Sequence, residues 1–249
     1  MSISAISSQD TYTRLASGYK INNAADDAAG LAISERLEAR TNGYDVGSMN
    51  AQDGISVLNI AEGALSGIHD SLQRIRELGV KASNGLYSAS DREAIQMEID
   101  GLLQSIQGTA KGTEFNTMKL LDGSMADMEL AANPEGGGLK IQLVNSTLES
   151  LGIEDFNVTG QFNLEDIDKA IDKVSESRSK LGAQSNALEH TIRYNDYASY
   201  NLTAANSRIK DTDYGEEIIK KNRDEALQQY QIFAIKAKNN EKAGFLKLF

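Results

Sequence analysis

The sequence predicts a mostly α fold: an elongated rod of long antiparallel helices, packed like a coiled coil, with one small β-hairpin. Three observations predict it. The 249 residues include a single proline, Pro134, so almost nothing interrupts a helix. Apolar residues recur every seven positions over much of 167–209, which keeps one side of a helix against other helices. Partly alternating apolar and polar residues flank a Gly-rich turn at 133–138, a pattern typical of a hairpin.

The bulk composition excludes several classes of function. The chain has 36 acidic and 25 basic residues and a formal charge of -11, a poor balance for binding nucleic acid. It has no cysteine, which excludes disulfides and thiolate sites. No long apolar run is present, so we expect no membrane span and no membrane partner. Residues 1–20 lack the basic start and apolar core of a secretory signal, so export would need a route without a cleaved signal peptide.

The N-terminal half begins weakly and then becomes strongly helical. Residues 1–20 are rich in Ser and Thr, and we expect a loosely ordered segment with a short helical piece. From Asp45 to Ala82 an apolar stripe predicts a long helix. Its members are Ile55, Leu58, Ala61, Leu65, Ile68, Leu72, Ile75 and Ala82. Glycines at 54, 63, 67 and 79 each cost about 1 kcal/mol relative to Ala, which predicts close packing against neighbours.

A second helix is predicted from Ser90 to Ala110. Ser90 precedes Glu93 by three residues, which is the pattern of a capping box. The apolar face of this helix consists of Ile95, Ile99, Leu102, Leu103 and Ile106. The chain then changes character, and residues 128–132 and 139–144 are the predicted strands of the hairpin.

A long helix is predicted from Asn163 to Ile209, on the order of 70 Å at ~1.5 Å per residue. Its seven-spaced positions form a seam that we expect to face a partner. The seam consists of Ile167, Val174, Leu181, Leu188, Asn195, Leu202 and Ile209.

The last segment, 211–249, is a basic helical tail with an apolar side that needs a partner. We expect it to be disordered in the monomer and to fold on docking. The apolar residues expected to dock are Leu227, Tyr230, Phe233, Phe245, Leu246, Leu248 and Phe249. These patterns divide the chain into an N-terminal segment (1–40), a first rod half (41–111), a connection with the hairpin (112–162), the long helix (163–210) and the tail (211–249).

Several runs of residues, kept in order along the chain, resemble one family. The most informative run is Lys20–Ile33, with its Ala-Ala-Asp-Asp-Ala-Ala-Gly centre, preceded by Leu15–Tyr19. The others are Asp70–Leu78, Thr113–Asn116 with Lys119–Leu121, Leu181–Asn186 and Ala198–Ala205. Together they cover roughly residues 13–214 and resemble bacterial flagellins, the subunits of the flagellar filament.

The resemblance implies an extracellular structural protein of the bacterial flagellum that self-assembles through helical rod packing and supports motility. Its implied partners are copies of itself or other flagellins, with an export chaperone at the C-terminal tail. Only about a dozen residues precede Leu15, where the family usually has an additional helix. Little fits between Ile153 and Phe162, where the family carries outer variable domains. The chain therefore resembles an atypical form, with a shortened N-terminal region and no outer domains.

The resemblance also implies a recognition surface on two rod helices. Its residues match flagellin positions bound by the vertebrate Toll-like receptor 5, a possible innate immune partner. A solvated charged face that packs against neighbouring rods is the competing interpretation. The matching residues are Gln73, Arg74, Glu77, Leu78, Ile95 and Glu98.

No catalytic, cofactor-binding or metal site is predicted, and we expect no enzyme. His69 and His190 are far apart and outside any His-Glu-x-x-His motif. The Asp26-Asp27 pair lacks a nucleophile or base and suits a helix N-terminus. The glycines at 136–138 lack the Lys and Ser/Thr of a phosphate loop. Two alternatives remain open: a hook–filament junction protein, which shares the Asp-Asp signature, and a non-polymerising flagellin-like partner or chaperone ligand.

Overall fold

The computed structural model describes residues 2–246, with side chains for residues 9–240. Its helices are α1 (Ser2–Ser17), α2 (Ala28–Ala82), α3 (Ala89–Gly112), α4 (Leu148–Leu151), α5 (Leu164–Lys210) and α6 (Tyr214–Leu246). Its strands are β1 (Glu114–Phe115), β2 (Met118–Lys119), β3 (Asp127–Ala131) and β4 (Gly138–Gln142). The predicted fold of long helices with a small hairpin is confirmed.

Contacts divide the chain into two units. The core unit comprises residues 42–198, and the terminal unit comprises the residues up to 41 together with those from 199 onward. Within residues 2–246, none of the helices combines the length and the apolar character that a lipid bilayer requires.

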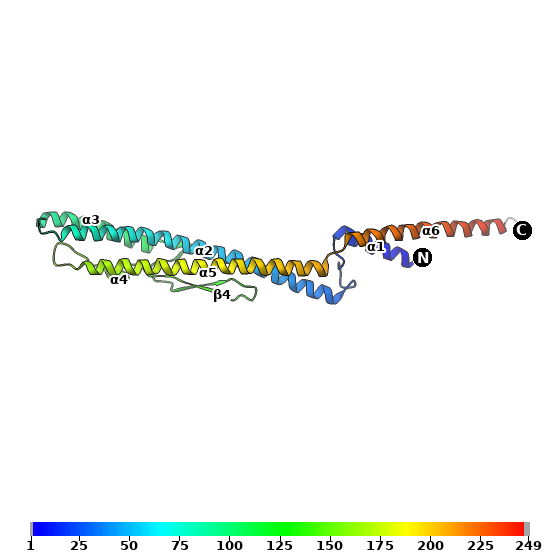
Figure 1. The fold of residues 1–249 in the computed structure, drawn as a ribbon, viewed down its shortest axis with the longest axis horizontal. Helices are drawn as coiled ribbons and strands as arrows, with labels where there is room; N and C mark the ends of the chain where they lie inside the picture. Colours follow the sequence, from blue (N-terminus) through cyan, green and yellow to red (C-terminus); the bar gives the residue numbers. More distant parts are fainter. Residues whose placement is uncertain (1, 247–249) are drawn as a thin grey trace. The chain divides into compact units, whose positions relative to one another are not determined.

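In the core unit, α2 and α5 lie side by side and run in opposite directions (Figure 1). Ser48 Oγ donates a hydrogen bond to Asp196 Oδ1 at 3.2 Å. Further along, Arg76 Nε contacts Asp168 Oδ1 at 2.5 Å. Residue numbers therefore fall along α5 as they rise along α2, so the predicted antiparallel arrangement is confirmed and this unit is elongated.

The core of this unit is an apolar layer shared by α2, α3 and α5. The predicted stripe of α2 is buried in it, chiefly through Leu58, Leu65, Ile68, Leu72 and Ile75. The predicted face of α3 adds Ile95, Ile99, Leu103 and Ile106. The long helix α5 starts and ends within one residue of its predicted limits. Its apolar repeat is what places it against the other two helices.

The predicted start of the first long helix at Asp45 is wrong, because α2 begins at Ala28. Its first turns bury small groups, Gly30 and Ser34, and no large apolar stripe marks them as helical. Asp27 starts the helix, since its Oδ1 accepts from the backbone N–H of Gly30 at 2.9 Å. Asp26 accepts from the backbone N–H of Asn22 and Asn23, which lowers the pKa of its carboxyl group. The two acids therefore cap and close this turn.

The predicted capping box of α3 is also displaced. Ser88 is the N-cap, with φ -71° and ψ 169°, and its hydroxyl accepts from Asp91 N at 3.3 Å. Asp91 Oδ2 accepts in return from Ser88 N at 2.9 Å and from the Ser88 hydroxyl at 2.7 Å. These bonds lower the pKa of Asp91. The box consists of Ser88 and Asp91 rather than Ser90 and Glu93, because the extended backbone of an N-cap falls two residues earlier.

The predicted hairpin is confirmed as β3 and β4, antiparallel with Met128 opposite Ile141 and Leu130 opposite Leu139. A second strand pair, β1 with β2, was not predicted. Its two-residue turn places Asn116 and Thr117 at φ 45° and 67°. Such a turn usually contains glycine, and no glycine marks this one.

In the terminal unit, α1 packs along the first part of α6. The predicted loose order of residues 1–20 is wrong for Ser2–Ser17, which form one helix. The tail likewise forms one helix from Tyr214, although we expected it to order only on docking. Between these helices and the rest of the unit, Tyr19 pairs with Asp211 in an isolated antiparallel bridge.

Candidate assembly and recognition surfaces

A charged patch lies where α2 meets α3, at four of the six residues matched to receptor binding. Arg74 is its centre: Nε and Nη2 donate to Glu98 Oε1 at 2.9 and 2.7 Å, and Nη1 donates to Glu77 Oε2 at 3.1 Å. The hydrogen bond with Glu98, followed by that with Glu77, raises the pKa of Arg74. Gln73 lies beside them and is exposed. All four side chains are open to solvent and can meet a partner.

The other two matched residues are not on the surface. Leu78 is 2% exposed and Ile95 is 7% exposed, and both belong to the apolar core. Their chemistry explains their place, because burying an aliphatic side chain contributes about 1.5–3 kcal/mol. In the described structure they support the helices that carry the patch, and their side chains are not presented to a partner.

The seven-spaced seam of α5 is occupied mainly within the chain. Its first four members, Ile167, Val174, Leu181 and Leu188, are buried in the core. Leu202 and Ile209, which belong to the terminal unit, are half-buried. The first four side chains are therefore not available for contacts between copies.

Asn195, the polar member of the seam, has a role that sequence reasoning missed. Its Nδ2 donates to the carbonyl O of Ala132 at 2.8 Å, and Asn50 Nδ2 donates to the carbonyl O of Ala131 at 2.7 Å. A Cβ at Gly47 would lie 2.6 Å from that Ala132 oxygen. The side chains of Asn50 and Asn195, with the close approach allowed at Gly47, thus hold the end of β3 against α2 and α5. A lone Asn in an apolar repeat is the signal that could have revealed this contact.

The prediction of close packing at the glycines of the α2 stripe has different outcomes at different positions. A Cβ at Gly54 would meet Leu130 Cδ1 at 2.3 Å, and one at Gly79 would meet Leu164 Cδ2 at 2.5 Å. Close packing is therefore confirmed at these two positions. It is wrong for Gly63 and Gly67, where a Cβ would meet nothing within 4 Å among the described residues.

The run Lys20–Ile33 begins in the segment between α1 and α2, which contacts the segment between α5 and α6. We call this contact, within the terminal unit, the joint. Thr212 N donates to Gly18 O at 2.9 Å, and Lys20 N donates to Lys210 O at 2.7 Å. The Lys210 ammonium also donates to Glu38 Oε1 at 2.7 Å. That contact lowers the pKa of Glu38 and raises the pKa of Lys210. The joint fixes the ends of α1 and α6 to the beginning of α2 and the end of α5.

The contact between α1 and α6 is polar among the side chains of residues 9–240. Glu217 and Asp224 of α6 are only 4% and 8% exposed. Arg14 of α1 approaches Glu217 Oε1 at 3.6 Å. The Tyr12 hydroxyl donates to Glu225 Oε1 at 2.7 Å, which raises the pKa of Tyr12 and lowers that of Glu225. This pair of helices buries carboxylates where helix pairs usually bury aliphatic groups.

Several apolar side chains of α6 lie on the opposite face. We call one set of them the outward stripe: Ile219, Ala226, Tyr230, Phe233 and Ala237, all exposed. Their spacings of seven, four, three and four put them on one helix face, opposite the buried Glu217 and Asp224. Tyr230 and Phe233 are each 71% exposed.

The residues predicted to dock at the tail fall into two groups. Leu227, Tyr230 and Phe233 are exposed on α6. Leu248 and Phe249 lie outside the described residues, as do the side chains of Phe245 and Leu246.

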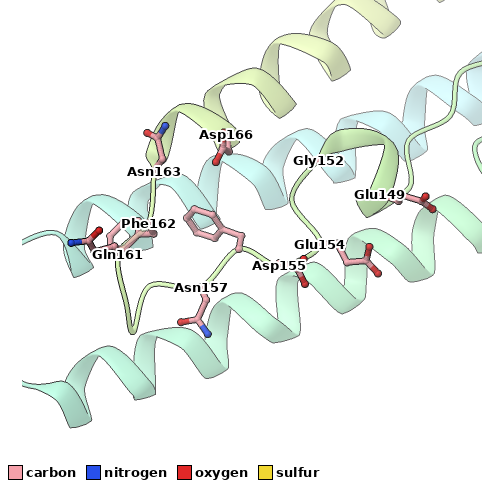
Figure 2. A pocket seen from close by; sticks show the side chains of 10 residues that line it. Glu149, Gly152, Glu154, Asp155, Asn157, Gln161, Phe162, Asn163 and Asp166 are labelled. Carbon is pink, nitrogen blue, oxygen red and sulfur yellow. The ribbon is translucent and has the colours of Figure 1, made fainter.

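An open pocket of about 720 Å³ lies in the core unit at the connection from α4 to α5. Figure 2 shows Glu149 of α4 and Asp166 of α5 on its rim, with the connecting loop between them. Its carboxylates are Glu149, Glu154, Asp155 and Asp166. Among the side chains that the structure describes, no group of three or more His, Asp or Glu residues is arranged to hold a metal ion.

Comparison with solved structures defines the class of protein. The fold resembles a crystal structure of Bacillus cereus flagellin, with a TM-score of 0.53 and 27% identity, covering 59% of this chain and 88% of that one. It also resembles a putative flagellar hook-associated protein from Vibrio parahaemolyticus, with a TM-score of 0.63 and 14% identity, covering 75% and 100%. The second likeness concerns the fold alone. The long helices and exposed α6 face therefore define a helical subunit of the flagellin type.

Comparison of sequences gives the family. Residues 1–126 match the bacterial flagellin N-terminal helical region, and residues 164–249 match the flagellin C-terminal helical region. The flagellin of Halalkalibacterium halodurans is 40% identical over 256 residues, which cover 100% of this chain and 94% of that protein. The flagellin of Bacillus subtilis is 37% identical over 280 residues, covering 97% and 92%. This chain belongs to the bacterial flagellin family. The predicted family is thus confirmed, and the junction-protein and non-polymerising alternatives are not favoured.

Proposed function

We propose that this flagellin is a structural subunit of the flagellar filament, located in the extracellular flagellum, and that neighbouring subunits cover the outward stripe of α6. A related protein, 35% identical over 246 residues, is a flagellar filament core protein of Treponema phagedenis. The family has a structural role, and we infer that this chain acts by assembling with itself or other flagellins rather than by catalysis.

The observation that carries the proposal is the exposed apolar face of α6. Each Å² of apolar surface removed from water contributes about 25 cal/mol, so two aromatic side chains exposed on one stripe favour association. Large exposed apolar patches are uncommon on monomeric proteins. Helix α1 has 16 residues and α6 has 33, so much of α6 extends past its intrachain partner (Figure 1). Residues 231–240 are all exposed in the described structure, so other molecules can cover this length.

Substitution of the stripe tests the proposal. Tyr230→Ser together with Phe233→Ser should abolish sedimentable filaments while the helical content of the chain is kept. Gln229→Ser is the matched control, because Gln229 is exposed beside Tyr230 on the same helix. Electron microscopy and sedimentation of concentrated protein would measure the effect. Normal filaments from the double variant would contradict the proposal.

The exposed charged patch supports a second role, recognition by an innate immune receptor. Arg74 and Glu98 are held together across two helices by charge-assisted hydrogen bonds, which gives a partner a fixed surface. Arg74→Ala and Glu98→Ala should each weaken the response of Toll-like receptor 5 reporter cells. Asp53→Ala, an exposed acid elsewhere on α2, is the control. A lack of response to the unmodified protein would contradict this role.

Before assembly, the exposed stripe needs another cover, and we propose an export chaperone at the tail. Exposed apolar side chains such as Tyr230 and Phe233 offer such a partner a surface to bind. We further propose export without a cleaved signal peptide. The mass of the protein recovered from culture medium should equal the mass calculated with its N-terminal residues retained. A mass lower by the equivalent of some 15–30 N-terminal residues would contradict that route.

A further inference from the structure

Among the side chains that the structure describes, the interface between α1 and α6 has its polar and apolar sides reversed. Its most buried described side chains are Thr11 of α1 and Glu217 and Asp224 of α6. The large apolar groups of α6 remain outside. If the two helices were free to rotate, turning the exposed Ile219 and Ala226 of α6 toward α1 would remove more apolar surface from water. Some contact must therefore hold the polar face inward.

The buried carboxylate of Glu217 identifies that contact. Its Oε1 lies 3.6 Å from Arg14 Nη1 and 3.2 Å from Lys220 Nζ. Its Oε2 is buried and has no hydrogen-bond partner among the described residues. A carboxylate so poorly solvated depends strongly on its cations. Arg14 is the one basic residue in the sequence of α1, so α1 can neutralise Glu217 in one arrangement only.

The neighbours of Glu217 disfavour other arrangements. Sliding α1 by one turn toward the C-terminal end of α6 would bring Arg14 against Lys220 and Lys221. Like charges in contact oppose such a slip. A single polar position inside a helix pair is the best-attested device for fixing register, and it acts at some cost in stability.

We propose that Arg14 and Glu217 form an ionic pin that sets the rotation and register of α1 on α6 and so keeps the outward stripe outward. They are positioning residues, because the role proposed for them is to orient α6 on α1. This inference concerns the isolated chain and goes beyond the proposed function, because the pin acts whether or not filaments form.

The absence of cysteine from the sequence allows a direct test by cross-linking. Cross-linking of Tyr12→Cys with Glu225→Cys reports the observed rotation and register of α1 on α6, which we call the observed setting, since these side chains are in contact. Tyr12→Cys with Leu227→Cys reports a rotated setting, because two residues correspond to about 200° around a helix. A short bismaleimide is applied to the full-length chain in solution, and the ratio of the two yields is measured.

With Arg14 and Glu217 intact, the Glu225 pair should dominate. Glu217→Gln should lower the ratio by about tenfold, because it removes the buried negative charge that Arg14 pairs with in this arrangement. Glu216→Gln is the matched control, an exposed neighbour that also pairs with Lys220, and it should leave the ratio unchanged. The exchanged pair Arg14→Glu with Glu217→Arg should restore the ratio.

Two results would overturn the ionic pin. One is a Glu217→Gln ratio equal to that of Glu216→Gln. The other is an exchanged pair that folds, as judged by circular dichroism, without restoring the setting. A third variant separates position from stability: Arg14→Leu with Glu217→Leu should keep or raise thermal stability while the ratio falls. An unchanged ratio in that variant would also overturn the pin.

Discussion

The core unit and the terminal unit bury opposite kinds of side chain. The core unit encloses Leu65, Leu72 and Ile75 completely. The terminal unit buries Glu217 and Asp224 between α1 and α6 and leaves Tyr230 and Phe233 of α6 exposed. Hydrophobic burial is the main favourable term in both folding and association. The core unit therefore uses this term within the chain, whereas the described part of α6 leaves apolar surface exposed, which we propose is covered by other subunits.

The largest expected effect comes from the core. Leu72→Ala removes a fully buried side chain and should lower the free energy of unfolding by about 2–5 kcal/mol. Phe233→Ala, on the exposed stripe, should change it by less than about 0.5 kcal/mol in the monomer. Denaturant unfolding followed by circular dichroism measures both. Equal losses would break the distinction between the two units.

Next, the same Gly→Ala substitution at two positions of α2 should change the free energy of unfolding in opposite directions. Gly47→Ala would force a Cβ against the Ala132 carbonyl and should lower the free energy of unfolding by about 1–3 kcal/mol. Gly63→Ala meets open space and should raise it by about 1 kcal/mol. Thermal melts of the two variants check this sign. A loss at Gly63 would mean that α2 packs differently from the described structure.

A loss of similar size to that at Gly47 is expected where Asn195 holds the hairpin against α5. Asn195→Ala removes the donor to the Ala132 carbonyl and should cost about 1–3 kcal/mol, since a buried acceptor is left unpaired. Hydrogen exchange should become faster in β3 and β4 and stay unchanged in α3. Gln184→Ala, at an exposed contact with β4, should have a lesser effect. Unchanged exchange in the hairpin of Asn195→Ala would contradict this role.

The smallest effect is the pH dependence of the joint in the terminal unit. Lys210 lowers the pKa of Glu38 from 4.5, so the stability it contributes is present above that value and is lost as pH falls through the lowered pKa. Glu38 raises the pKa of Lys210 from 10.5, so that contribution is present below 10.5 and is lost as pH rises through the raised pKa. Glu38→Gln should slightly lower the melting temperature at pH 7 and should have no effect near pH 2. A constant difference across this range would contradict the ionic origin.

The sequence predicted the features that depend on repeated apolar spacing. The α2 stripe, the α5 seam and the hairpin are long patterns, and each is present in the structure. Short polar signals were less decisive. Ser88 and Ser90 both resemble an N-cap, and only the backbone distinguishes them. Residues 28–44 fold as a helix on small side chains that carry little periodic signal.

The candidate surfaces were harder to predict than the fold. Leu78 and Ile95 occupy positions matched to receptor binding, yet their side chains face the core, because a motif match does not tell which side of a helix a residue faces. The pairing of Arg14 with Glu217 joins residues about two hundred positions apart, and no local pattern connects them. The apolar side of α6 was visible in sequence. That it faces away from α1 was not.

Hydrogen exchange in the monomer and in sedimented filaments tests the central claim most directly. The account predicts that amides of Leu65–Ile75 in the core unit are strongly protected in both states. Amides of Ala226–Ala237 on α6 should exchange rapidly in the monomer and become protected in the filament, where neighbouring subunits cover the outward stripe. Equal protection of residues 226–237 in the two states would contradict it.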